Sequence, residues 1–219
     1  MKKRKIKREK TKYNILITAL IPLLILLLSF RLLVFDTNFY EKEFDKNNVY
    51  EFFNKETVNR ELNSLFNYFI NNKELTTNFF NQKEKIHLED VKILINGAIN
   101  LLIILSFLFF MALIYYYRNK KLHGFLNSLM FGGLLTLIYL IIILFLVLFN
   151  FKGLFLNFHL IMFDNDYWML NPETDNLIVL FPTQFFYDAI IRIMIYSVII
   201  SLVFIGFSYY IRRLYYSKT

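Results

Sequence analysis

Four long apolar runs constrain this chain more than any other feature of its 219 residues. Two of the runs carry no charge, and each of the other two carries a single arginine. Each run reaches the roughly 20 residues that an α-helix needs to cross about 30 Å of hydrocarbon. Backbone groups in lipid must bond within their own segment, which favours helices. We predict an all-α membrane protein built on a bundle of four transmembrane helices, at residues 13–35, 93–117, 125–149 and 189–211.

The distribution of charge predicts how these spans are oriented. Eight lysines and arginines fall in residues 1–12, and three more in each of the segments 118–124 and 212–219. In contrast, residues 36–92 carry a net charge of −3 and residues 150–188 a net charge of −4. Because positive residues accumulate on the cytoplasmic side, we predict that the two longer segments are extracytoplasmic and that both termini are cytoplasmic. Orientation and contact with anionic lipid explain the basic terminus better than nucleic-acid binding does.

The two extracytoplasmic segments carry enough pattern to form a small cap. In the first, apolar residues recur at the spacing of an amphipathic helix. These residues are Val58, Leu62, Leu65, Phe66 and Phe69. In the second, the pairs Asn171-Pro172 and Asp175-Asn176 indicate a turn. We expect the flanking apolar stretches, residues 158–163 and 177–181, to form the short strands of a β-hairpin.

Two of the three histidines fall in these outer segments, each close to a predicted span. His87 precedes the second span and lies three residues from Asp90, so the two share a face if that helix begins early. A carboxylate bonded to one ring nitrogen would leave the other nitrogen as a general base. His159 follows the third span and precedes a polar cluster. The cluster consists of Asp164, Asn165, Asp166 and Trp168. The alternative interpretations are a solvated helix start and an Asx-rich turn.

Two arginines form a further candidate pair. Arg31 and Arg192 each lie about one turn inside the outer end of a predicted span. Charges within a membrane are costly and are usually paired or functional. Either these side chains only extend to the interface, or they bind a phosphate or carboxylate at the outer leaflet. Asp36 and Asp188 are candidate structural partners.

Several kinds of chemistry are excluded by what the chain lacks. It has no cysteine, which rules out disulfides, thiolate nucleophiles and cysteine-based metal sites. It has no G-x-S-x-G, P-loop or H-E-x-x-H motif, and Ser64 is the only serine in the outer segments. The histidines and carboxylates match no local metal-ligand spacing. We therefore expect no serine acyl-enzyme, no metal and no cofactor.

Two motifs stand immediately before the second and fourth spans. The first is EKIHLEDVK at residues 84–92, and the second is FHLIMFDNDYWMLNPETDNLIVLFPTQFFYD at residues 158–188. Together with the four-span layout and the chain length, they resemble the Lit family. These proteins are the lipoprotein intramolecular transacylases of low-GC Gram-positive bacteria. The resemblance covers essentially the whole chain.

The resemblance implies a reaction at the outer leaflet. The substrate would be a diacylglyceryl-modified lipoprotein with a free N-terminal cysteine, and the sn-2 acyl chain would move onto the α-amino group of that cysteine. The attacking amine belongs to the substrate, so the enzyme needs no nucleophile of its own. The family's histidines correspond to His87 and His159, with Asp90 in the first motif. We expect His87 to act as the base and His159 to stabilise the oxyanion.

Two other functions remain compatible with the residues. One is a different outer-leaflet lipid acyltransferase or hydrolase, which product analysis would separate. The other is a non-enzymatic membrane assembly or sensor subunit, for which replacement of His87 or His159 would affect stability alone. A transporter is disfavoured, because the spans lack interior acids and no inverted repeat is visible.

Overall fold

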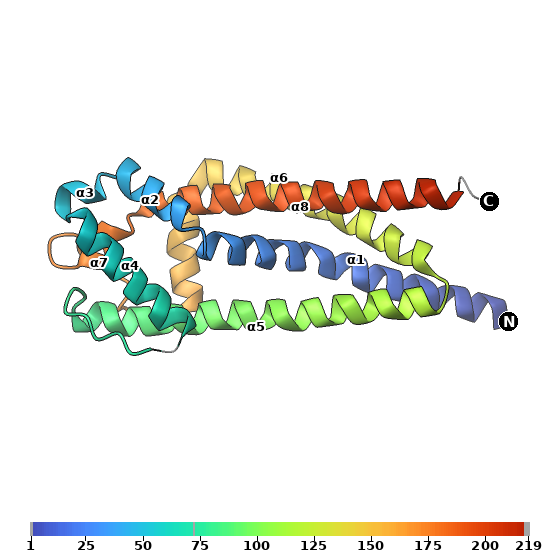
Figure 1. Cartoon of the computed structure of the whole chain (residues 1–219), viewed down its shortest axis with the longest axis horizontal. Helices are drawn as coiled ribbons and strands as arrows, with labels where there is room; N and C mark the ends of the chain where they lie inside the picture. The colour runs from blue at the N-terminus through green and yellow to red at the C-terminus, as the bar shows by residue number, and fades with distance from the viewer. Residues whose placement is uncertain (1, 72, 217–219) are drawn as a thin grey trace. The chain divides into compact units, whose positions relative to one another are not determined.

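The computed structural model describes residues 2–71 and 73–216, and over these residues the chain is helical with no β-strand. The helices follow one another along the chain (Figure 1). They are α1 (Lys2–Val34), α2 (Thr37–Lys46), α3 (Val49–Phe52), α4 (Lys55–Ile70), α5 (Gln82–Arg118), α6 (Leu122–Met162), α7 (Asn176–Leu180) and α8 (Thr183–Tyr216).

Four of the helices in the described part of the chain are long and apolar enough to cross a membrane. They are α5, α6, α8 and the Ile15–Val34 part of α1. The predicted all-α membrane architecture is therefore confirmed. Three of these helices, α5, α6 and α8, extend beyond the predicted apolar runs.

The chain divides into two compact units, and the division falls within the long helices. The first unit consists of Met1–Leu32, Leu101–Phe145 and Arg192–Thr219. The second unit consists of Leu33–Asn100 and Leu146–Ile191. The second unit thus holds both outer segments together with the helix ends that adjoin them.

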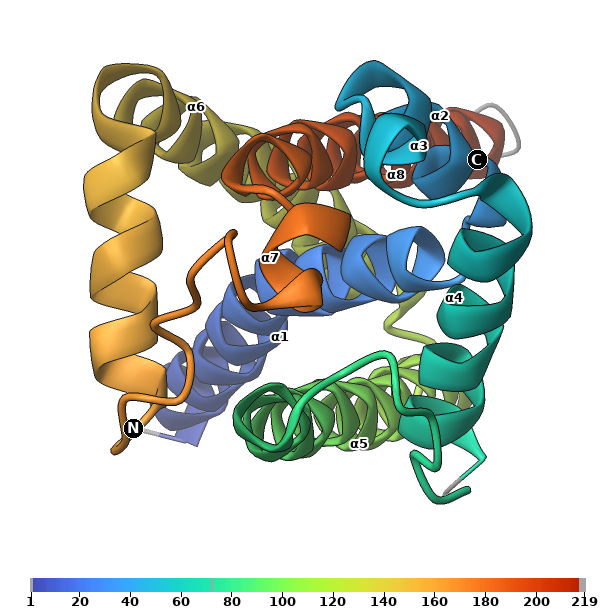
Figure 2. The same ribbon diagram turned by 90° about the vertical axis from the view of Figure 1, so that its left-hand side faces the viewer.

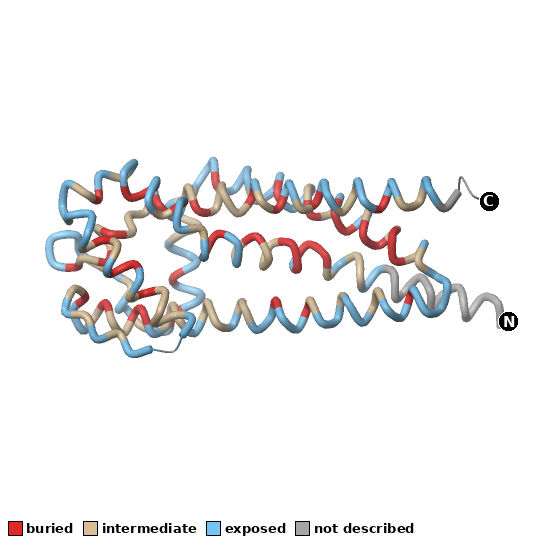
Figure 3. Tube along the Cα trace, viewed as in Figure 1, coloured by how far each residue is buried: buried red, intermediate tan, exposed pale blue. Residues whose placement is uncertain are grey.

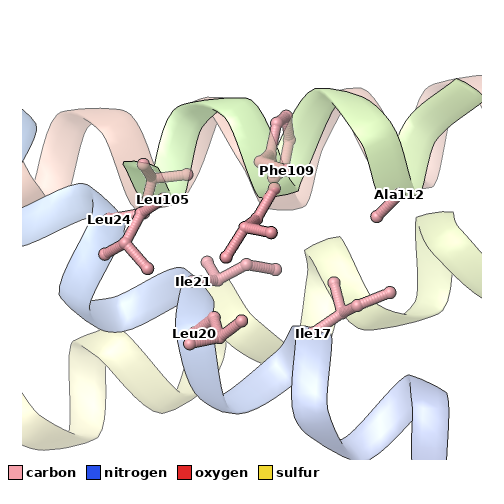
Figure 4. A pocket seen from close by; sticks show the side chains of 8 residues that line it. Ile17, Leu20, Ile21, Leu24, Leu105, Phe109 and Ala112 are labelled. Atoms are coloured by element: carbon pink, nitrogen blue, oxygen red, sulfur yellow. The ribbon is translucent and has the colours of Figure 1, made fainter. Parts of the chain in front are cut away.

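In the first unit, α1 supplies the best buried apolar side chains. Ile21 and Ile25 pack against Leu129 of α6, and Leu24 packs against α5. The contact between α1 and α5 is lined by aliphatic side chains and Phe109 (Figure 4). Buried residues follow this stretch of α1, whereas much of the outer surface of α5 and α8 is exposed (Figure 3). Apolar side chains on such a surface suit contact with lipid.

Three hydroxyl groups inside the first unit donate to partners that suit an apolar environment, whereas the buried Ser201 hydroxyl has no hydrogen-bond partner among the described residues. Ser197 donates to the Ser29 hydroxyl oxygen at 2.9 Å, and Ser208 donates to the Leu126 carbonyl at 2.6 Å. Thr136 donates to the carbonyl of Gly132, one turn earlier in α6, at 2.8 Å. Small hydroxyl residues of this kind hold membrane helices together without an unsatisfied polar group.

The second unit is built around α4 and an aromatic core. The predicted amphipathic helix is confirmed, because α4 buries Val58, Leu62 and Leu65. Its N-cap is Asn54, whose side chain accepts a hydrogen bond from the Thr57 N–H at 2.8 Å. The aromatic core joins α2 and α4 to Phe181, which follows α7, and to the first turn of α8. Its members are Phe39, Tyr40, Phe44, Phe66, Phe181 and Phe185.

The predicted β-hairpin in the second outer segment is wrong. Residues 158–163 lie at the end of α6, and residues 177–181 lie in α7 and its C-cap. Short apolar runs do not distinguish a strand from a buried helix by periodicity. The turn between them is confirmed, because the Asp175 N–H donates to the Asn171 carbonyl at 2.8 Å.

The long helix α6 is interrupted at Asn150. This residue has a non-helical backbone conformation with φ −154° and ψ 56°, and its side chain accepts a hydrogen bond from the Gly153 N–H at 3.0 Å. Asn150 therefore acts as an N-cap that restarts the helix. Figures 1 and 2 show the restarted part running across the direction of the first turns of α5.

Candidate functional site

A capping box at the start of α5 fixes the position of His87. Asn81 precedes the helix, and its Oδ1 accepts a hydrogen bond from the Glu84 N–H at 3.0 Å. The Glu84 carboxylate in turn accepts from the Asn81 N–H at 2.6 Å. This reciprocal pair satisfies two N–H groups that a helix start leaves open. His87 follows one turn later on the same helix, which begins before the predicted span.

His159 lies in the restarted part of α6 and is held by the backbone. Its Nδ1 lies 2.7 Å from the carbonyl oxygen of Phe155, one turn earlier. A carbonyl only accepts hydrogen bonds, so we assign the proton to Nδ1. The Nε2 atom of the neutral ring then carries a free lone pair. His159 is thus prepared to accept a proton at Nε2.

The two imidazoles meet in the second unit. Their ring centroids are 6.1 Å apart with an interplanar angle of 32°. Phe163 lies 5.0 Å from His87 and 5.5 Å from His159, and Trp168 lies 4.9 Å from His159. Only 7% of His87 and 8% of His159 is exposed. The ring pair therefore lies in aromatic surroundings that exclude most water.

The hydrogen bonding of His87 differs from that of His159. Its Nδ1 is buried and has no hydrogen-bond partner among the described residues. A buried N–H without a partner is rarer in proteins than a buried acceptor without one, which favours a neutral ring that carries its proton on Nε2. The pair then offers one proton acceptor, His159, and one hydrogen-bond donor, His87.

Asp90 holds the polar turn rather than the imidazole. Its Oδ2 accepts a hydrogen bond from the Asn165 side chain at 2.9 Å. The Asn165 Oδ1 accepts from the Tyr167 N–H at 3.1 Å and so shapes the turn locally. The bond between Asp90 and His87 that the sequence suggested is not made. Instead, Asp90 ties α5 to the segment that carries Trp168.

A comparison with protein families identifies the family to which this chain belongs. The family model described as "Lipoprotein intramolecular transacylase Lit" matches residues 15–186, which include His87, His159, the first motif and all but the last two residues of the second. The chain belongs to the Lit family. It is an integral membrane lipoprotein intramolecular transacylase, as the motifs predicted. Among curated proteins, no relative matches the chain.

Solved structures of Lit from Bacillus cereus share the fold of this Lit-family protein. One is 22% identical with a TM-score of 0.86, and the match covers 96% of this chain and 99% of that one. Two others carry a histidine replaced by arginine or by alanine, with TM-scores of 0.82 and 0.85 at 23% and 22% identity. Each match covers 99% of this chain, and 99% or 100% of the other chain. At these identities the likeness establishes the fold.

In this member of the Lit family, some predicted site residues lie together and others do not. His87, Asp90, His159, Asn165 and Trp168 are connected through the ring contacts and the hydrogen bond described above. Asp164 and Asp166 are exposed in the same turn. Arg31 and Arg192 belong to the first unit. No group of three or more His, Asp or Glu side chains in the described part of the chain has an arrangement that could hold a metal ion.

Three residues of the site escaped the sequence analysis. Phe155 supplies the carbonyl that fixes His159, Phe163 contacts both rings, and Glu84 caps the helix of His87. Phenylalanines are too common in this chain to mark a site. For Glu84 a signal was present, because Asn81 and Glu84 have the spacing of a capping box.

Proposed function

We propose that His87 and His159 catalyse transfer of the sn-2 acyl chain of a diacylglyceryl lipoprotein onto its own N-terminal amine. The observation that carries this proposal is the buried imidazole pair, 6.1 Å apart, with one proton acceptor and one donor. Acyl transfer to an amine needs both functions. The amine must lose a proton, and the carbonyl oxygen must be stabilised as it gains charge.

The hydrogen bonds favour an exchange of the roles expected from the sequence. The substrate amine attacks the sn-2 ester carbonyl, so a C–N bond forms and the C–O bond to glycerol then breaks. His159 Nε2 takes the proton that the amine loses and returns it to the departing glycerol oxygen. His87 Nε2–H donates to the tetrahedral oxyanion. The products are an N-acyl amide and a free sn-2 hydroxyl, and no external acyl donor or water is consumed.

The surroundings of the pair suit a lipid substrate. Both reacting groups belong to one molecule, so the site contributes mainly by holding them close and aligned. The restarted part of α6 also presents exposed apolar side chains, which fit a helix at the boundary of the hydrocarbon. These are Leu156, Phe158, Leu160, Ile161 and Met162. In our proposal the acyl chains stay in lipid beside this face.

The polar turn is the proposed binding site for the peptide end of the substrate. Asp164 and Asp166 are exposed carboxylates that attract the substrate ammonium, and Trp168 covers His159. Asn165, held by Asp90, keeps this turn on α5. In this proposal Asp164 and Asp166 bind the substrate ammonium before His159 takes its proton.

The charge pattern supports placing this site at the extracytoplasmic leaflet. In the same orientation, Arg31 lies near the outer end of α1 and Arg192 lies nine residues into α8, and we propose that both bind an acidic lipid group. Lysine keeps the charge but loses the bidentate geometry of arginine. If alanine at both positions left transacylation and protein level unchanged, this binding role would be wrong.

The reaction itself is tested by product analysis. The protein is expressed in a bacterium that lacks its own N-acylating enzymes, and the N-terminal peptide of a lipoprotein is analysed by mass spectrometry. We expect conversion of the diacylglyceryl form to an N-acylated lyso form of identical total mass. Fragment ions place one acyl chain on the amine and leave a free glycerol hydroxyl.

A labelled phospholipid distinguishes the competing enzymes. If label from free phospholipid appears on the cysteine amine, the acyl donor is external and the intramolecular mechanism is wrong. If an acyl chain is lost from the lipoprotein without appearing on the amine, the protein is a hydrolase.

A further inference from the structure

The most deeply buried carboxylate of the second unit joins the helix of His87 to a distant segment. Glu84 is 1% exposed, and both of its carboxylate oxygens are used. One accepts from the Asn81 N–H within the capping box, and the other accepts from the Leu177 N–H at 2.5 Å. The second bond crosses 93 positions of sequence. A carboxylate that only capped its own helix would not need the bond to the Leu177 N–H.

The segment just before α7 is also bonded to the start of α5 through a second buried carboxylate, that of Asp175. Asp175 is 4% exposed, and it accepts from the Asn81 side chain at 2.7 Å and from the Asn171 N–H at 2.8 Å. The side chain of the next residue, Asn176, donates to the Phe79 carbonyl at 2.6 Å. We call Asn81, Glu84, Asp175 and Asn176 the clamp. Its hydrogen bonds link the start of α5 to the start of α7.

The clamp holds together the two chain segments that frame the imidazole pair. On one side, His87 lies one turn beyond Glu84 on α5. On the other side, the clamped turn is continuous with the segment of Trp168, whose ring is 4.9 Å from that of His159. Lys83 adds a bond to the Met169 carbonyl, beside Trp168. The clamp, together with the bonds of Lys83 and Asp90, therefore holds the Trp168 segment against the helix of His87, and loosening it weakens that attachment.

We propose that Glu84 is a positioning residue for the acyl transfer. It acts through the clamp, which sets the Trp168 segment against the imidazole pair, and it does not touch the reacting atoms. This role rests on the proposed function of the histidines. From the motif alone, Glu84 would be interpreted as an ordinary helix cap.

Glutamine at position 84 tests this role with little change in volume. The amide has a single oxygen, so it accepts from either the Asn81 N–H or the Leu177 N–H. Its NH₂ group then faces the remaining N–H, and two donors meet in a buried site. A glutamine still forms a capping box, so the helix survives while its bond to the Leu177 N–H is lost and the clamp is loosened. Glu173→Gln is the matched control, because Glu173 is an exposed carboxylate in the turn that contains Asp175.

The chain contains one tryptophan, so Trp168 reports the position of its segment without any label. The purified full-length proteins are compared in lipid for helical content by circular dichroism, for quenching of Trp168 by acrylamide, and for turnover of a diacylglyceryl lipopeptide. For Glu84→Gln we expect unchanged helical content, stronger quenching and turnover reduced roughly tenfold to a hundredfold. Glu173→Gln is expected to match the wild type in all three measurements.

Two results would overturn the proposal. One is Glu84→Gln with wild-type quenching of Trp168, whatever its activity, because the clamp would then not hold the segment. The other is stronger quenching with full turnover, because the position of the segment would then not matter. Should Glu84→Gln fail to fold, Asp175→Asn loosens the clamp from the other side and is measured in the same way. The quenching result stands even if the wild type proves to catalyse a different reaction.

Discussion

The two histidines differ in what holds their rings, and this difference can be measured at the scale of single residues. A carbonyl fixes His159, whereas His87 has a buried nitrogen without a partner among the described residues. Glutamine can donate a hydrogen bond but cannot take up a proton. We therefore expect His87→Gln to retain more transacylation than His87→Ala, and His159→Gln to be as inactive as His159→Ala.

The expected losses are large enough to observe in cells. Loss of a general base typically costs about 10²- to 10⁴-fold, and loss of one oxyanion donor about 10²- to 10³-fold. His123→Ala, in the first turn of α6, is the control and should leave lyso-lipoprotein formation unchanged. The measurement is the ratio of lyso to diacyl peptide at equal membrane protein level. Retention of activity in His159→Gln but not in His87→Gln would instead support His87 as the base and His159 as the oxyanion donor, as expected from the sequence.

At this scale the sequence indicates the two histidines as candidates, but it does not predict their hydrogen bonds. His87 and Asp90 have helical spacing, yet the carboxylate binds Asn165, which is 75 positions away. The bond from the Leu177 N–H to Glu84 joins residues that are even farther apart, at 93 positions. Such partners depend on how the two outer segments pack, and no local pattern records that packing.

At the scale of elements, one close helix contact depends on a glycine. A Cβ atom added to Gly132 of α6 would lie 2.6 Å from the Cβ of Ile21 on α1. We expect Gly132→Ala to destabilise the protein by about 1–3 kcal/mol, because the two backbones must separate to accommodate it. Thermal unfolding in detergent measures the loss. Gly97→Ala is the matched control, since a Cβ there meets nothing within 4 Å, and an equal loss in both variants would refute the explanation.

The turn between α6 and α7 is expected to lose stability in acid. Burial alone would raise the pKa of the Asp175 carboxyl, but its hydrogen bonds, first from the Asn171 N–H and then from the Asn81 side chain, hold the pKa below its ordinary value. A carboxyl with a lowered pKa in the folded state stabilises the protein above its unfolded pKa. That contribution disappears as the pH falls through the folded pKa.

Asp175→Asn tests this dependence. The variant should be less stable than the wild type at pH 7, and the difference between them should shrink as the pH falls below about 4. The unfolding temperature is measured across this range, with Glu173→Gln as the exposed control. A difference that stays constant with pH would mean that folding does not shift the pKa of the Asp175 carboxyl.

Element types were predictable from the sequence only where one periodicity dominated. The stripe on α4 and the four apolar helices were clear. The stretch after Asn150 was not, because residues 158–163 at its end are apolar on nearly every side and have the length of a strand. Its helical state depends on the Asn150 side chain capping a new helix at Gly153. The same cap turns the residues around His159 into a helix, which places Phe155 one turn from the imidazole.

At the scale of the whole molecule, charge and chemistry divide the chain in the same way. Both histidines of the proposed site fall in the second unit, whereas the basic N-terminus, the loop after α5 and the basic tail belong to the first. The two segments with net negative charge make up most of the second unit. The orientation that follows from the basic segments therefore also decides which leaflet the proposed site faces.

Reporter fusions test this orientation of the chain in the membrane. Sandwich fusions of a reporter after Arg60 and Leu170 should report an extracytoplasmic position, and fusions after Lys121 and at the C-terminus a cytoplasmic one. Replacing the eight basic residues among the first twelve with glutamine should produce a mixture of orientations, because their charge retains that end in the cytoplasm. A cytoplasmic signal from either of the first two fusions would place His87 and His159 inside the cell. The histidine pair would then be separated from lipoproteins in the outer leaflet, and the proposed reaction could not occur there.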